Sequence, residues 1–180
     1  MTAHDNSPPP PTVAWRKWLL PLLLMGGLTV VLYFVRGEPL RDLDRPRLDD
    51  AVALWEASKP GSYRISIQLE GRQRGRFDIQ VRDGEVIDAQ LDGRPLPQRR
   101  TRETWSVDGM FQTLRTDLEM RERAQQGQPG ARSLRLKAVL HKQYGLPMRY
   151  LRIEVMRKGA NPEAGWSVLS FEPANAEAAP

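Results

Sequence analysis

Arginines are the most prominent candidates for binding chemistry in this sequence, and they fall into two clusters. Arg72, Arg74 and Arg76 alternate at the two-residue period of a β-strand, which would place their side chains on one face. A second cluster follows in the stretch RPLPQRRTR. Acidic residues interleave with these arginines and no aromatic stacking motif accompanies them, so an ordinary charged surface is the competing interpretation. The candidate anion-binding patch, for lipid headgroups, a polyanionic envelope polymer or an acidic partner, consists of Arg72, Arg74, Arg76, Arg99, Arg100 and Arg102.

Residue types that usually carry catalysis or hold metals are scarce. The sequence contains no cysteine, which removes disulfides, a thiol nucleophile, a thiolate zinc site and a lipidated cysteine from consideration within it. His4 lies in the N-terminal tail, and His141 falls on an expected strand face next to a turn. No further histidine or cysteine completes a metal set or a catalytic triad. We therefore expect no catalytic residues, no metal site and no cofactor.

Carboxylates are the remaining candidates for acid-base chemistry. Asp117 and Glu119 precede Arg121 and Arg123 by four residues, which is the favourable order for ion pairs on an exposed helix surface. We interpret these residues in that way. The sequence has no G-x-S-x-G motif, phosphate-binding glycine loop or calcium loop. A hydrolase whose carboxylates are brought together only by the fold stays open as an alternative function.

The elements that would position such side chains begin with a long apolar run. Between Lys17 and Arg36 lie 18 uncharged residues, which make about 27 Å of α-helix and so match a bilayer core. The run has no polar stripe, and no small-residue cleavage site follows it, so we predict a retained membrane span. We expect residues 18–35 to contact the lipid bilayer through Trp18, Leu19, Leu20, Leu22, Leu23, Leu24, Leu28, Val30, Val31, Leu32, Tyr33, Phe34 and Val35.

Two signals conflict over the direction of this span. Arg16 and Lys17 precede the run, but more arginines follow it, and a positive-inside count would place the domain in the cytoplasm. That rule is calibrated on short loops, whereas large domains translocate largely regardless of charge. A short basic tail before a first apolar run also resembles an uncleaved signal anchor. We therefore predict a single-pass membrane protein with an extracytoplasmic domain. A cytoplasmic domain that binds nucleic acid or anionic lipid through the arginines is the alternative.

The remaining sequence predicts one α+β domain. We divide the chain into a cytoplasmic proline-rich tail (1–17), the span (18–35), a linker (36–46), the domain (47–173) and a disordered tail (174–180). Capped amphipathic patterns predict one helix starting after Asp44 and another starting after Ser106. Three alternating apolar segments follow each helix, with tight turns at Asp83-Gly84 and at 145–147. This order predicts a twisted antiparallel sheet of about six strands with both helices on one face.

Short motifs along the domain carry a family resemblance: Trp55, Tyr63, the VRDG hairpin with Val86 beyond it, the SVDGMF helix start and the YGLP turn. In this order they resemble the bacterial family known as domain of unknown function 6174, over about residues 50–172. The resemblance implies a small exported, lipoprotein-like or membrane-anchored domain, and with the predicted span it implies a location in a bacterial inner membrane. It brings no assigned activity. Members tend to have an Asp before a Gly-Tyr-Pro turn, where this chain has His141 and Gly145-Leu146-Pro147. No role of that carboxylate therefore carries over, and a helix replaces the lipidated cysteine.

These observations favour a binding function over a reaction. The net charge of +5 is a mild excess for 180 residues, so we expect no nucleic acid partner. We expect a non-catalytic domain that binds or scaffolds an unknown protein or envelope-polymer partner. The sequence does not indicate the oligomeric state.

Overall fold

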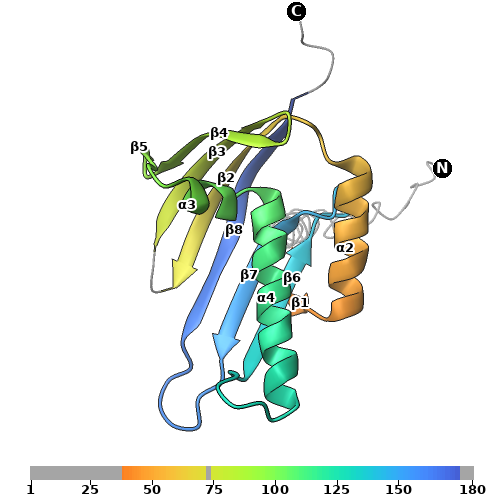
Figure 1. The fold of residues 1–180 in the computed structure, drawn as a ribbon, viewed down its shortest axis with the longest axis vertical. Helices are drawn as coiled ribbons and strands as arrows, with labels where there is room; N and C mark the ends of the chain where they lie inside the picture. Colours follow the sequence, from red (N-terminus) through yellow and green to blue (C-terminus); the bar gives the residue numbers. More distant parts are fainter. Residues whose placement is uncertain (1–37, 72–73, 175–180) are drawn as a thin grey trace, which may run out of the picture. The chain divides into compact units, whose positions relative to one another are not determined.

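One antiparallel sheet of eight strands organises the computed structural model, which describes residues 38–71 and 74–174. The strand order is β1-β6-β7-β8-β2-β3-β4-β5 (Figure 1). An α+β fold with an antiparallel sheet is therefore confirmed, and all six strands expected from the alternating patterns are present. They are β2 (Tyr63–Gly71), β3 (Gly75–Arg82), β4 (Glu85–Leu91), β6 (Leu134–Leu140), β7 (Pro147–Glu154) and β8 (Glu163–Pro173). The other two, β1 (Arg41–Asp42) and β5 (Arg94–Pro95), have two residues each and lie at the sheet edges.

The sheet consists of two three-stranded meanders joined side by side. The first meander contains β2, β3 and β4, and the second contains β6, β7 and β8. The last strand of the chain, β8, pairs antiparallel with β2 and so closes the gap between the meanders. A bulge in this pairing falls between Ser66 and Ile67. Each meander follows a long helix, α2 (Arg45–Ser58) or α4 (Val107–Gln125).

Both long helices begin where the sequence supplies a cap. The Asp44 side chain accepts a 3.0 Å hydrogen bond from the backbone N–H of Arg47 at the start of α2. Ser106 does the same at the start of α4, where its Oγ accepts a 3.1 Å hydrogen bond from the N–H of Gly109. Such caps satisfy N–H groups that a helix leaves without internal partners. A short helix, α3 (Arg99–Thr104), occupies the polar segment for which the sequence predicted only a connection.

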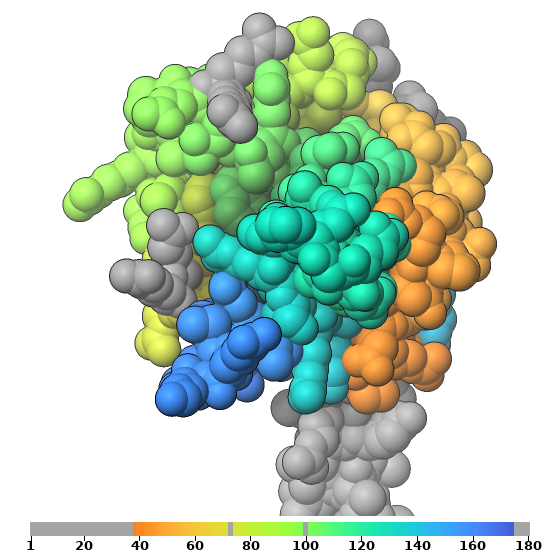
Figure 2. Space-filling view, turned by 60° about the horizontal axis from the view of Figure 1, so that its bottom comes forward, coloured from red at the N-terminus to blue at the C-terminus, as the bar shows by residue number. Residues whose placement is uncertain are grey.

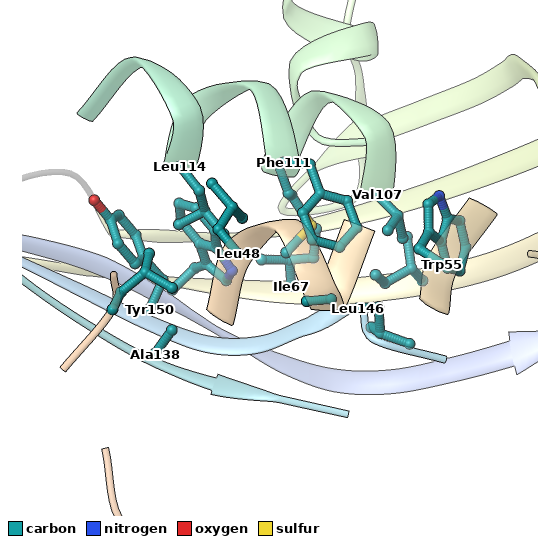
Figure 3. Packing of buried hydrophobic residues seen from close by; sticks show 14 of the residues in the cluster. Leu48, Trp55, Ile67, Val107, Phe111, Leu114, Ala138, Leu146 and Tyr150 are labelled. Carbon is teal, nitrogen blue, oxygen red and sulfur yellow. The ribbon is translucent and has the colours of Figure 1, made fainter. Parts of the chain in front are cut away.

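The core lies between the helices and one face of the sheet. In Figures 1 and 3, α2 and α4 lie on the same side of the strands, with apolar side chains pointing between the two layers. Leu48 and Trp55 come from α2, Val107 and Leu114 come from α4, and all four are fully buried. Burying one such side chain stabilises the fold by about 1.5–3 kcal/mol. The predicted placement of both helices on one face agrees with this packing.

The turn between β6 and β7 packs closely under α2. Gly145 has a φ of +72°, and a Cβ at this position would lie 2.1 Å from the backbone oxygen of Ala51. Only glycine fits such a close approach in this left-handed conformation. Leu146 beside it is fully buried. The YGLP turn therefore joins the second meander to α2.

Several predicted segments lie outside the described residues. They include the cytoplasmic tail (1–17), the membrane span (18–35) and residues 175–180 of the predicted disordered tail. Across residues 38–71 and 74–174, no helix is long and apolar enough to cross a membrane.

Candidate functional site

Two aromatic side chains hold the first turn of α4. The Tyr63 hydroxyl accepts a 3.2 Å hydrogen bond from the backbone N–H of Val107. Trp55 Nε1 donates a 2.9 Å hydrogen bond to Asp108 Oδ1. Burial raises the pKa of Tyr63 to about 12, so the hydroxyl stays neutral at physiological pH. These contacts fix the start of α4 to α2 and β2.

The short helix α3 approaches this first turn closely. A Cβ on Gly109 would lie 2.1 Å from the backbone oxygen of Glu103. A larger residue at position 109 would therefore push the end of α3 away from α4. Trp105, between the two helices, stacks on Phe77 with ring centroids 4.8 Å apart. The position of α3 against α4 and β3 is thus set by backbone contact and aromatic packing.

An open cleft of about 770 Å³ lies beside the first turn of α4. Its walls come from the β3–β4 turn with the start of β4, from α3, and from α4 itself. We call it the α4 cleft. It mixes acidic, basic, amide and apolar side chains, among them Glu85, Val86, Arg102, Glu103, Asp108 and Gln112.

Motifs that are distant in the sequence meet around this cleft. Gly84 and Val86, from the VRDG hairpin, line one wall. Ser106, Asp108 and Gly109, from the SVDGMF motif, line the other. Trp55 and Tyr63 form the hydrogen bonds to the first turn of α4 that are described above. The YGLP motif is placed elsewhere, against the middle of α2.

The predicted arginine patch is distributed over several environments. Arg74 is exposed just before β3. Arg76 Nη2 lies 2.9 Å from Asp78 Oδ1 and donates a 3.2 Å hydrogen bond to Ser66 Oγ. Arg102 Nε donates a 2.6 Å hydrogen bond to the backbone oxygen of Leu96.

Arg72 lies outside the described residues, and Arg99 and Arg100 form the start of α3. Two members of the patch, Arg76 and Arg102, have polar protein partners, and Arg74 is exposed to solvent. The patch as a binding surface stays a prediction.

His141 closes a turn. Its Nδ1 accepts hydrogen bonds from the backbone N–H groups of Gln143 and Tyr144, both at 3.2 Å. The residue lies just after the end of β6, not on its face as the alternating pattern suggested. Among the described residues, no group of three His, Cys, Asp or Glu side chains is placed to hold a metal ion.

The interpretation of Asp117 as a solvated helix-surface residue was wrong. Asp117 is only 7% exposed, and its Oδ2 accepts a 2.7 Å hydrogen bond from the hydroxyl of Tyr150 on β7. Its Oδ1 lies 3.4 Å from Arg152 Nη1. Arg121, the residue expected to pair with it, donates a 2.7 Å hydrogen bond to the backbone oxygen of Leu43. Helix spacing alone missed this cluster because the partners of Asp117 come from β7.

Burial and the nearby Asp117 carboxylate both raise the pKa of Tyr150. The Tyr150 hydroxyl therefore stays protonated and donates to Asp117, while Arg152 offsets the negative charge. A buried carboxylate with these two partners joins α4 to the middle of the sheet. We assign the cluster a structural role, because Asp117, Tyr150 and Arg152 are not among the residues that line the α4 cleft.

Part of the chain matches a known protein family. The model of a family of unknown function (DUF6174) matches residues 47–126. This match confirms the predicted resemblance over residues 47–126, whereas the YGLP turn and the rest of the predicted range 50–172 lie outside the match. The matched region runs from α2 to the end of α4 and so contains every wall of the α4 cleft. No curated protein and no solved structure matches the chain.

Proposed function

We propose that this protein is held in a membrane by residues 18–35 and carries a non-catalytic extracytoplasmic domain that binds or scaffolds a partner. The observation that supports the binding role is the α4 cleft. Ligand sites are typically concave and largely preformed, with a few fixed polar groups among apolar ones. The α4 cleft has this character, because Trp55, Tyr63 and Gly109 fix its backbone through the contacts described above.

The charges in the cleft indicate what a partner should present. Glu85, Glu103 and Asp108 line it together with one arginine, Arg102. The Arg102 guanidinium already donates to the backbone oxygen of Leu96. A cationic or amide group on a protein or envelope polymer is therefore complementary to the cleft.

The same carboxylates keep a hydrolase as the second candidate function, because paired carboxylates in a cleft can do acid-base chemistry. The binding role is favoured by what Asp108 already does. Its Oδ1 accepts from Trp55 Nε1 and so takes part in joining α2 to α4. Purified protein that hydrolyses an envelope polymer, with turnover lost in Glu85→Gln or Asp108→Asn, would favour the hydrolase instead.

Membrane anchoring is supported by the sequence of the apolar run. It is long enough to span a bilayer, is flanked by Lys17 and Arg36, and carries aromatic residues near both ends. The extracytoplasmic side is supported by the short basic tail before a first apolar run.

A crosslinking experiment in cells tests the binding role. A photoreactive amino acid replaces Gln112, which lines the cleft, or Thr116, which is exposed one turn further along α4. We expect a defined crosslinked product from position 112 and none from position 116. Glu85→Arg should remove that product by reversing a charge in the cleft. Equal crosslinking from both positions, or a product unchanged by Glu85→Arg, would contradict binding in the cleft.

A further inference from the structure

The segment that joins β1 to α2 lies beside the end of α4. Arg45, the first residue of α2, forms a 2.7 Å ion pair with Glu122 in the last turns of α4. Arg121 donates to the backbone oxygen of Leu43, between β1 and α2. The α4 cleft surrounds the opposite end of the same 19-residue helix, about 28 Å away along its axis. The β1–α2 segment and the cleft therefore lie at opposite ends of α4.

A basic and partly apolar surface lies in the β7–β8 loop, at the end of the sheet where β6 begins. Met156, Arg157 and Lys158 form an exposed stretch in the β7–β8 loop, with Met156 47% exposed. The backbone N–H of Val155 donates a 2.8 Å hydrogen bond to Ser133, in the segment that follows α4. Figure 2, turned to bring this end forward, shows the blue β7–β8 loop beside the end of α4. We call this loop surface the basic tip, and its members are Met156, Arg157 and Lys158.

Acidic residues do little to neutralise the basic tip. Glu122 pairs with Arg45, and Glu154 pairs with Arg132 at 3.2 Å. Asp42, Asp44 and Glu163 are exposed carboxylates elsewhere at this end. The β7–β8 loop itself carries Arg157 and Lys158 and no acidic residue. An exposed methionine beside such cations is the composition expected of a surface that contacts anionic headgroups.

The short segment before β1 limits how far β1 can lie from the membrane. If residues 18–35 span the bilayer, five residues (36–40) separate the span from β1. Five extended residues reach at most about 18 Å. The start of β1 must then lie within this distance of the membrane, and this step rests on the proposed function.

We propose that the basic tip rests on an anionic bilayer surface with Met156 at the level of the headgroups. The domain is then oriented with the α4 cleft pointing away from the membrane, where it is accessible to a partner. The interaction depends on charge, because each Lys or Arg near an anionic surface is worth about a fivefold change in binding. Screening by salt should weaken it.

Because the sequence contains no cysteine, a single introduced cysteine can be labelled specifically. The full-length protein with Met156→Cys carries one environment-sensitive fluorophore and is placed in nanodiscs of phosphatidylcholine, with or without phosphatidylglycerol. We expect a blue-shifted emission and quenching by headgroup nitroxides only when phosphatidylglycerol is present. Ile87→Cys, on β4 and 43% exposed, is the control position. A fluorophore there should show the emission of a water-exposed dye with either lipid composition.

Charge substitutions in the labelled protein complete the test. Arg157→Gln with Lys158→Gln should abolish the dependence on anionic lipid, whereas Arg64→Gln with Arg82→Gln, two exposed arginines of the other meander, should preserve it. An aqueous signal from position 156 in anionic discs would overturn the proposal while leaving the anchor intact. Protein that fails to stay in the discs would instead contradict the proposed membrane anchor. Circular dichroism of each variant verifies that it is folded.

Discussion

Tyr150 on β7 and Asp117 on α4 meet inside the molecule, where the tyrosine hydroxyl donates a 2.7 Å hydrogen bond to the carboxylate. Both residues are buried. Arg152 adds a second contact to the same carboxylate. This relationship joins α4 to the sheet and gives the first test of how the domain is held together.

Tyr150→Phe should lower the free energy of unfolding by about 1–3 kcal/mol, because it removes the donor to a buried carboxylate oxygen. Urea unfolding of the full-length protein in detergent micelles measures the change. Glu119→Gln, on the exposed side of the same helix, is the control and should change stability by less than about 0.5 kcal/mol. Equal stability of Tyr150→Phe and the wild type would show that the hydrogen bond contributes nothing net.

Tyr63→Phe should change how stability depends on alkaline pH. The pKa of Tyr63 is raised by burial from 10.0 to about 12, so its neutral form is favoured in the fold. That contribution is fully present below pH 10 and is lost as pH rises through 12. The variant should be less stable near neutral pH by about 1–2 kcal/mol, because the Val107 N–H loses its acceptor. The difference in unfolding free energy between the wild type and the variant should narrow above pH 10. A difference that is constant with pH would contradict the raised pKa of Tyr63.

Gly145→Ala should be much more destabilising than a comparable glycine substitution. A Cβ at position 145 would meet the backbone of Ala51 at 2.1 Å, whereas Gly127, at a similar φ of +71°, has no neighbour within 4 Å. Gly127→Ala should cost about 1–2 kcal/mol from backbone strain alone. Gly145→Ala should exceed this value, because α2 must also shift. Thermal unfolding of the two variants makes the comparison, and similar costs would refute the close packing of the turn.

The six-arginine patch can be tested beside the basic tip. Replacing Arg72, Arg74, Arg76, Arg99, Arg100 and Arg102 with Gln should reduce binding to anionic vesicles if these residues act as one surface. The full-length protein in phosphatidylcholine nanodiscs, with anionic vesicles added, gives the measurement. We expect a smaller loss per arginine than at the basic tip, because Arg76 and Arg102 already have partners. Unchanged binding would leave the patch as an ordinary charged surface.

Local features of the fold were predictable because they depend on neighbouring residues. Alternating apolar residues marked the six main strands, Asp83-Gly84 marked a hairpin, and Asp44 and Ser106 marked helix starts. These signals act over a few residues, where backbone sterics and caps decide the conformation. The short helix α3 was missed because it lacks the usual start signal. Its N-cap residue, Gln98, makes no side-chain cap hydrogen bond.

Long-range features were not predictable from the same patterns. The place of β8 between β7 and β2 depends on pairing across the whole chain. The burial of Asp117 depends on Tyr150, which is 33 residues away in the sequence. The α4 cleft likewise needs the VRDG turn and the SVDGMF helix start to meet in space. The shared family motifs were the one signal that could have indicated it.

Membrane topology is the central claim, since the binding role and the basic tip both depend on it. Single cysteines replace Ala3, in the predicted cytoplasmic tail, or Ile87, exposed on β4. Spheroplasts of a bacterial host are treated with a membrane-impermeant maleimide before and after lysis. The account predicts that Cys at position 87 reacts in intact spheroplasts and that Cys at position 3 reacts only after lysis. Labelling of position 3 but not position 87 in intact spheroplasts would contradict it and favour a cytoplasmic domain.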